Sequence, residues 1–436
     1  MSERTLIRGG CVLTLGDRTP NFSQADVLIE DGLVTEVGNG LRSRGAEVID
    51  ARDTIVMPGF VDTHRHVWKS LFRNLGDSGA AVSADVFGPH YQADDLYAAT
   101  LIGLLGALEA GITTVVDWSD IQMSSQHTAA ALQAHADAGI RSVFVPGAPS
   151  WSSDQERHNA TYEISARNEL TTLAYGAGTV DGTDPETEAD GWVSARASGL
   201  RTHAHVGRSP ERRREISGLA RSGLLDATAT LVHGSHLVAS DLDLIASAGS
   251  LLSLTPASDM ASGRGVPPIQ GLIDRNIDTG LGVDDEAVAP GDIFAQMRAA
   301  NSLQHATMFD LKLAGKAGLP KLLNTRQVIK FATSGGARVA GLGKVTGSIE
   351  AGKQADIIVL RTDRPNIHPI NDPIGAVVWG MDTSNVDVVL VAGKIVVHGG
   401  SIQADVDRAR KAATDSRQRV AEASGMVATS LSGDVR

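Results

Sequence analysis

The middle of the chain alternates between apolar runs typical of buried strands and amphipathic runs typical of helices. The alternation predicts a helix over 94–111, a strand over 112–120, a helix over 124–139 and a strand over 140–147. Further strand-like runs follow at 200–207, 229–237, 249–258 and 278–287. Strands that alternate with helices pair in parallel, so about 280 residues of such units favour an α/β fold with a (β/α)8 TIM barrel over residues 58–345.

Both ends of the chain carry a different pattern, in which short Ile- and Val-rich strands are joined by glycine-containing turns. This pattern covers residues 1–57 and returns over residues 346–402. The closing strands have no partner inside a completed eight-stranded barrel, so we expect the two segments to form one small β-sandwich domain. Residues 403–436 are expected to form a C-terminal helical tail.

Charge and cysteine content exclude several kinds of partner and site. The formal net charge of −12 argues against a nucleic-acid surface, which needs clustered Lys and Arg. Cys11 is the sole cysteine, so neither a disulfide framework nor a thiolate zinc site is expected. The sequence shows no apolar segment of membrane-spanning length and no apolar core of a signal peptide, so we expect a cytoplasmic protein without membrane partners.

A short histidine motif at 56–74 is the first indication of a metal site. His64 and His66 end an apolar run, and residues two apart on a strand point to the same face. By itself the pair is equally compatible with two solvated histidines at a strand end. More candidate ligands stand at later strand ends: His203, His205, His233, His236, Asp284 and Asp285. Imidazoles with one carboxylate suit zinc, or iron or manganese, and leave a position open for a water of lowered pKa.

The order of these motifs resembles the amidohydrolase superfamily, specifically its cytosine deaminase, S-adenosylhomocysteine deaminase and triazine hydrolase branch. The resemblance rests on "PGFVDTHRH", a later strand-end His, "VHGSHL", "GVDDE" and "GSIEAGKQADIIVL", and it spans nearly the whole chain. It implies one divalent metal ion, zinc by preference and iron or manganese as alternatives, held by His64, His66, His205 and Asp284. It further implies that Asp284 is the proton acceptor and that His233 polarises the group under attack.

One departure from the family pattern concerns proton transfer. Deaminases of this branch place a glutamate three residues after the third metal ligand, where it passes protons to the leaving amine, and this chain has Arg208 there. Asp285 and Glu286 are alternative acids, and Asp285 is also expected to bind the substrate, as are Trp68, Arg208 and His233. Arg208 is either a solvated residue that opens the next helix or a ligand for an anionic group of the substrate.

Other departures concern the metal count and the pocket. The expected fourth strand, "TTLAYGAG", has no lysine of the kind that bridges two metals in some members, so we expect a single ion. Asp259 replaces the Asn that is common after Ser in the seventh-strand segment. Trp68 is expected to form an aromatic wall over a flat substrate, and core packing is the alternative role for it. Phe72 is expected to pack in the core. His203 is expected to be a core residue, and His236 is expected to lie where the chain enters the next helix.

Together these patterns predict a metal-dependent hydrolase that attacks a carbon–nitrogen bond of a small heterocyclic molecule, such as a cyclic amide, urea, lactam or amidine. Deamination of a purine, pyrimidine or triazine is the alternative within the same chemistry. A non-hydrolytic lyase or an inactive binding barrel is the alternative of another class, and the intact ligand set argues against inactivity. The expected assembly is a homodimer or a higher homo-oligomer.

Overall fold

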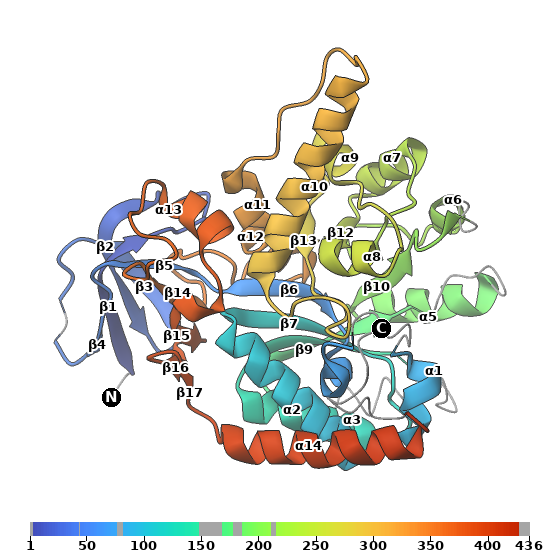
Figure 1. The fold of residues 1–436 in the computed structure, drawn as a ribbon, viewed down its shortest axis with the longest axis horizontal. Coiled ribbons are helices and arrows are strands. Elements are labelled where there is room, and N and C mark those ends of the chain that lie inside the picture. Colours follow the sequence, from blue (N-terminus) through green and yellow to red (C-terminus); the bar gives the residue numbers. More distant parts are fainter. Residues whose placement is uncertain are drawn as a thin grey trace, which may run out of the picture.

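The computed structural model describes residues 3–42, 44–75, 82–147, 168–177, 185–210 and 215–426. At its centre lies a closed barrel of eight parallel strands (Figure 1). In chain order these are β6 (Phe60–Arg65), β7 (Ile112–Ser119), β8 (Arg141–Pro146), β9 (Thr171–Gly176), β10 (Arg201–Val206), β11 (Ala229–His233), β12 (Leu251–Leu254) and β13 (Thr279–Leu281). The predicted TIM barrel is therefore confirmed.

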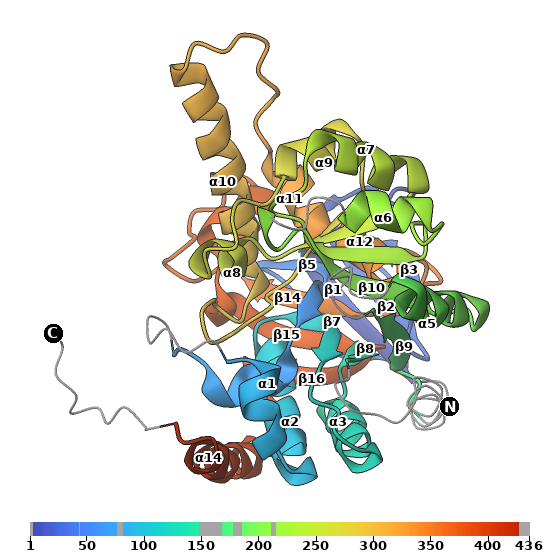
Figure 2. The same ribbon diagram turned by 90° about the vertical axis from the view of Figure 1, so that its right-hand side faces the viewer.

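Helices follow the barrel strands and cover the outside of the barrel, as Figure 2 shows from a second direction. They include α2 (Ala93–Glu109), α3 (Ser125–Ala138), α5 (Pro185–Ala197), α6 (Glu215–Arg221), α7 (Ala239–Ala248), α8 (Pro256–Ala261), α9 (Ile269–Asp274), α10 (Ile293–Leu313), α11 (Thr325–Phe331) and α12 (Ser334–Val339). Helices α3 and α7 end at Gly139 and Gly249, whose positive φ angles of 68° and 71° suit a left-handed cap. No helix in the described part of the chain combines the length and apolar composition that a membrane crossing needs.

The two ends of the chain meet in a second, mixed sheet beside the barrel (Figure 1). Its strands are β1 (Arg4–Val12), β2 (Phe22–Glu30), β3 (Leu33–Gly38), β4 (Glu47–Asp50), β5 (Thr54–Pro58), β14 (Ile357–Arg361), β15 (Val386–Val391), β16 (Lys394–His398) and β17 (Ser401–Ile402). The junction is the antiparallel pair β5 and β14, in which Val56 lies opposite Val359. The predicted β-domain from both termini is thus present, and hydrogen bonds join its strands into one sheet.

The last described helix, α14 (Val406–Ala423), lies along α2 on the outside of the barrel (Figure 1). Arg419 of α14 forms an ion pair with Asp95 in the first turn of α2, and its Nη1 donates to the carbonyl of His90. The tail segment is helical over this range, and it packs on the barrel's helical layer.

A buried ion pair joins the barrel to the terminal sheet. Nε of Arg141, at the start of β8, lies 2.6 Å from Oδ2 of Asp356, just before β14, and both side chains are almost fully buried. Asp356 also accepts a hydrogen bond from the backbone N–H of Ala392, 2.7 Å away. The pair therefore fixes the barrel wall against the sheet.

Replacing Arg141 by Met is expected to destabilise the fold, because it leaves the Asp356 carboxylate buried without its partner. Breaking one side of a buried pair costs about 3–5 kcal/mol. The control is Arg361→Met, which removes an exposed pair with Asp363 and should cost no more than about 1 kcal/mol. Thermal unfolding of the two variants measures the difference, and equal unfolding midpoints would contradict the assignment.

Candidate metal centre and active site

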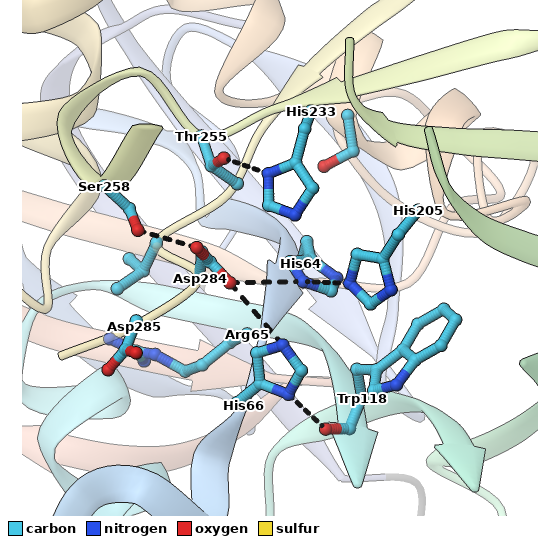
Figure 3. A network of polar contacts seen from close by, with 12 residues as sticks. His64, Arg65, His66, Trp118, His205, His233, Thr255, Ser258, Asp284 and Asp285 are labelled. Carbon is cyan, nitrogen blue, oxygen red and sulfur yellow. Dashed lines mark hydrogen bonds and ion pairs between the residues drawn. The ribbon is translucent and has the colours of Figure 1, made fainter. Parts of the chain in front are cut away.

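The candidate ligands come together at the carboxyl ends of the barrel strands (Figure 3). His64 and His66 lie at the end of β6, His205 lies on β10, His233 ends β11, and Asp284 follows β13. All five side chains are buried. The strand ends of a parallel barrel converge on one face, and this convergence brings together residues that are far apart in the sequence.

The possible ligand atoms of these residues lie close to one another. Oδ1 of Asp284 is 3.4 Å from Nε2 of His64 and 3.5 Å from Nε2 of His66, and Nε2 of His205 is 3.2 Å from Nε2 of His64. Three overlapping groups of ligand atoms, each within 4.8 Å, cover the set: His64, His66, His205, His233, Asp259 and Asp284. The four residues that the resemblance implied as metal ligands all belong to it.

The protonation of the histidines fits a divalent cation. Burial lowers the pKa of His64 to about 3 and holds the pKa of His205 well below its usual value. Both rings are therefore neutral near pH 7, as metal binding requires. Their two Nε2 atoms lie 3.2 Å apart, and neutral imidazoles at this spacing can both offer a nitrogen lone pair to one metal ion.

His66 is held by groups that the sequence did not single out. Its Nδ1 lies 3.1 Å from the carbonyl oxygen of Trp118 near the end of β7 (Figure 3). It also lies 3.3 Å from Oδ1 of Asp120, which follows β7. Two acceptors at Nδ1 place the proton there and leave the lone pair on Nε2, the nitrogen that faces Asp284. The signal was available in "VVDWSD", an apolar strand that ends in polar residues at the functional face of the barrel.

His233 is oriented by the loop after β12. Its Nδ1 lies 2.9 Å from Oγ1 of Thr255 and 3.0 Å from Oδ1 of Asp259. Burial alone would raise the pKa of Asp259, but His233 and Arg264 outweigh it, so the carboxylate is ionised and accepts from Nδ1. The other ring nitrogen points toward His64 (Figure 3), and the ring of His233 stacks on that of His205 with 5.2 Å between the ring centroids.

The two oxygens of Asp284 have different partners. Oδ1 faces His64 and His66, whereas Oδ2 accepts a hydrogen bond of 2.6 Å from Oγ of Ser258 and contacts the guanidinium of Arg264. Burial opposes ionisation, but Arg264 and the hydrogen bond with His64 outweigh it and hold the pKa of Asp284 well below its usual value. The residue is therefore a carboxylate, as a metal ligand must be.

Two site residues adopt a left-handed backbone conformation that residues other than glycine rarely adopt. The φ angles are +76° at His233 and +65° at Asp284. Left-handed residues of this kind cost about 1–3 kcal/mol and persist where the surroundings hold them. Their presence at two strand ends indicates that the fold gives up stability to aim these side chains at the centre.

The two acidic residues after Asp284 form ion pairs with Lys and Arg side chains. Asp285 lies 2.8 Å from Nζ of Lys69 and accepts the backbone N–H of Ala287. Glu286 is buried and accepts hydrogen bonds from Arg73 and Ser70. Burial would raise its pKa, but the positive charges of Arg65 and Arg73 outweigh burial, so its pKa is lowered. A carboxylate held in this ionised state is a poor proton donor, which weakens the alternative in which Glu286 replaces the missing acid.

Arg208 and Trp68 differ in their access to the centre. Arg208 is partly exposed after β10, and its positive charge contributes to the lowered pKa of His205, which places it near the ligands. Trp68 is fully buried, packs edge-on against Tyr91, and donates its indole N–H to Asp120. Its role as a substrate wall stays a prediction, and its position is that of a core residue; Phe72 is likewise buried.

The two remaining histidines lie apart from the ligand groups found among the described residues. His203 is fully buried on β10, and burial lowers its pKa well below the usual value. His236 is partly exposed, and its backbone N–H donates to the carbonyl of Gly207. These positions agree with a core residue and a residue of the strand-to-helix connection.

Comparison with known sequences places the chain in a family context. The Amidohydrolase family model matches residues 55–396. The chain is 28% identical over 430 residues to the 5'-deoxyadenosine deaminase of Methanothermobacter thermautotrophicus, covering 92% of this chain and 95% of the relative. It is 27% identical over 428 residues to the 5-methylthioadenosine/S-adenosylhomocysteine deaminase of Pyrococcus furiosus, covering 91% and 95%.

Solved structures share the fold across nearly the whole chain. An adenosine deaminase from Xanthomonas campestris with bound zinc superposes with a TM-score of 0.82 at 20% identity, covering 96% of this chain and 98% of that one. Atrazine chlorohydrolase from Arthrobacter aurescens TC1 in complex with zinc gives a TM-score of 0.83 at 22% identity, covering 95% and 100%. At these identities the likeness supports the two-part architecture alone.

Proposed function

The chain belongs to the amidohydrolase family, and from this membership we propose that it hydrolyses a carbon–nitrogen bond of a small heterocyclic molecule with the help of one divalent metal ion. The proposal is supported by two buried groups of possible ligand atoms that share His64: one with His66 and Asp284, the other with His205 and His233. The same set argues against an inactive barrel, because neutral imidazoles and an ionised carboxylate serve no packing need there.

Zinc is the ion that we propose, with iron or manganese as alternatives. Three imidazoles and one carboxylate are donors that zinc accepts, and the two solved structures above are zinc complexes. Bound there, the ion would supply a water molecule of lowered pKa for attack on the substrate. No lysine occurs in β9, which supports one ion rather than a bridged pair.

The chain's own residues would then move the protons. Asp284 directs Oδ1 toward the histidine ligands, and we assign to it the acceptance of the proton that the attacking water loses. His233, held by Thr255 and Asp259, would polarise the group under attack and stabilise the charge that develops on it. Asp284 would return the proton to the departing nitrogen.

This use of one carboxylate favours cyclic amides, ureas, lactams and cyclic amidines as substrates. Deamination of a purine, pyrimidine or triazine remains the second candidate, because the relatives named above are deaminases of adenosine derivatives. The absence of a glutamate at position 208 argues against it. A screen of heterocyclic amines and cyclic amides, read separately for ammonia release and for ring opening, distinguishes the two.

We further propose a cytoplasmic enzyme that binds neither nucleic acid nor membranes and assembles as a homodimer or a higher homo-oligomer. The net charge of −12 supports the absence of nucleic-acid binding. Mass measurement of the protein in solution tests the assembly.

Replacing Arg208 by Glu is expected to abolish the native activity and to raise trace deamination of neutral bases. A guanidinium does not deprotonate near pH 7, so Arg208 can orient or neutralise a substrate group but cannot relay a proton. A glutamate would restore the acid that deaminases of this branch use. Rapid ammonia release by the wild-type enzyme from cytosine, guanine or adenosine derivatives would contradict this role.

A further inference from the structure

Arg264 is a partly buried cation beside the site that the sequence patterns did not indicate. It lies after α8 between Gly263 and Gly265, whose φ angles of +66° and +119° suit glycine. A Cβ at Gly265 would lie 3.3 Å from Nε2 of His236 and from Cβ of Ser235, so the loop packs closely on the connection after β11. The Gly-Arg-Gly sequence thus allows the chain to turn tightly and aim the Arg264 side chain at the centre.

Two edges of the Arg264 guanidinium are fixed by the protein. Nε lies 3.0 Å from Oδ1 of Asp259, and Nη2 donates to Oγ of Ser258, 2.8 Å away, and to Oδ2 of Asp284. Asp259 also orients His233, and Asp284 faces the histidine ligands. The guanidinium is therefore held in one orientation by residues that belong to the reacting centre.

The third nitrogen, Nη1, is left for another molecule. Every hydrogen bond that Arg264 makes within the described part of the chain uses Nε or Nη2. Nη1 is not among the buried polar atoms that lack a partner, and 19% of the side chain is exposed, so this nitrogen faces accessible space. A rigid guanidinium with two free N–H groups is a strong ligand for an anionic oxygen.

We propose that Nη1 of Arg264 binds a carboxylate or a similar anionic oxygen of the substrate, next to the carbon that is attacked. Arg264 is then a specificity-determining residue, and the substrate class narrows to heterocyclic or aromatic amides and amidines that carry an acid group. This assignment rests on the proposed function for the identity of the reaction, and it rests on the geometry of Arg264 for the identity of the group that is bound.

Binding of matched acids and neutral analogues tests the proposal without knowledge of the substrate. The probes are benzoate with benzamide, nicotinate with nicotinamide, and orotate with uracil, titrated calorimetrically into protein saturated with zinc. The variants are Arg264→Met and Arg264→Lys, and the control is Arg275→Met, which breaks the pair with Asp243 away from the site. Zinc content and unfolding midpoints are measured for each variant, so that binding is compared at equal occupancy in folded protein.

In the wild type, the acid of at least one pair is expected to bind about tenfold or more tightly than its neutral partner. Arg264→Met should weaken the acid about 10- to 100-fold and leave the neutral partner within about twofold, since a hydrogen bond to a charged group is lost. The affinity of Arg264→Lys for the acid should lie between those of the wild type and Arg264→Met. The affinity of Arg275→Met should match that of the wild type. An acid preference that survives in Arg264→Met would show that zinc itself binds the acid, and this result would overturn the proposal.

The absence of an acid preference in all three wild-type pairs would overturn it as well. Failure of the proposed function has a different signature. In that case no compound of the hydrolysis screen releases ammonia or opens its ring, whereas the acid preference in binding and its loss in Arg264→Met are still observed.

Discussion

Replacing His64 and His66 together by alanine is expected to remove the bound metal and with it all measurable turnover. The two rings supply neighbouring ligand nitrogens, each within 3.5 Å of Oδ1 of Asp284, and two ligands of four cannot be lost without loss of the site. Metal analysis of the purified protein measures the ion directly. We expect one equivalent per chain in the wild type and none in the double variant.

His236→Ala is the matched control, because this histidine lies near the site but outside the ligand groups of the described residues. It should retain its metal. Treatment of the wild type with a chelator should abolish turnover, and added zinc or iron should restore it. Two equivalents of metal in the wild type, or metal retained by the double variant, would refute the proposed centre.

The barrel and its centre could be predicted because they follow from periodic signals. Apolar strands alternate with helices through the middle of the chain, and such an alternation has few solutions other than a parallel barrel. Once the barrel is predicted, polar residues at strand ends must converge, and His64, His66, His205 and Asp284 were found in this way with the help of the family resemblance. In the structure His64 groups with His66 and Asp284 on one side and with His205 and His233 on the other.

The residues that orient the ligands were harder to predict, because their signals are not periodic. Thr255 and Asp259 contact His233 from a loop and a short helix, and the sequence does not encode the direction in which such a segment turns. Arg264 is the clearest example. Only its two flanking glycines and their positive φ angles explain why a residue in a polar loop reaches Asp284.

The role of Trp68 illustrates a limit of another kind. Its spacing after the histidine pair was compatible with a pocket wall and with the core, since both need an aromatic side chain at helical spacing. The hydrogen bond from its indole to Asp120 gives a reason for a buried tryptophan that composition cannot show. Asp120 in turn contacts Nδ1 of His66, so Trp68 is linked to His66 through Asp120.

Replacing Asp284 by Asn is expected to lower kcat by about 10²- to 10⁴-fold while part of the metal affinity remains. The amide oxygen is still a weak ligand, but an amide cannot accept the proton, and loss of a general base has an effect of this size. The geometry makes the loss steep, because Oδ1 is the only carboxylate oxygen within 3.5 Å of both His64 and His66 among the described residues. Activity is measured at saturating metal, with metal content determined on the same sample.

Asp285→Asn is the matched control for that experiment, since it makes the same change one residue away in a carboxylate paired with Lys69. We expect a loss well below that of Asp284→Asn, because Asp285 interacts with a cation and a backbone N–H rather than with the histidines. If Asp284→Asn keeps a near-normal kcat with metal bound, the proton must leave by another route. His233 would then be the next base to consider, because Asp259 accepts from its Nδ1 and the other ring nitrogen points toward His64.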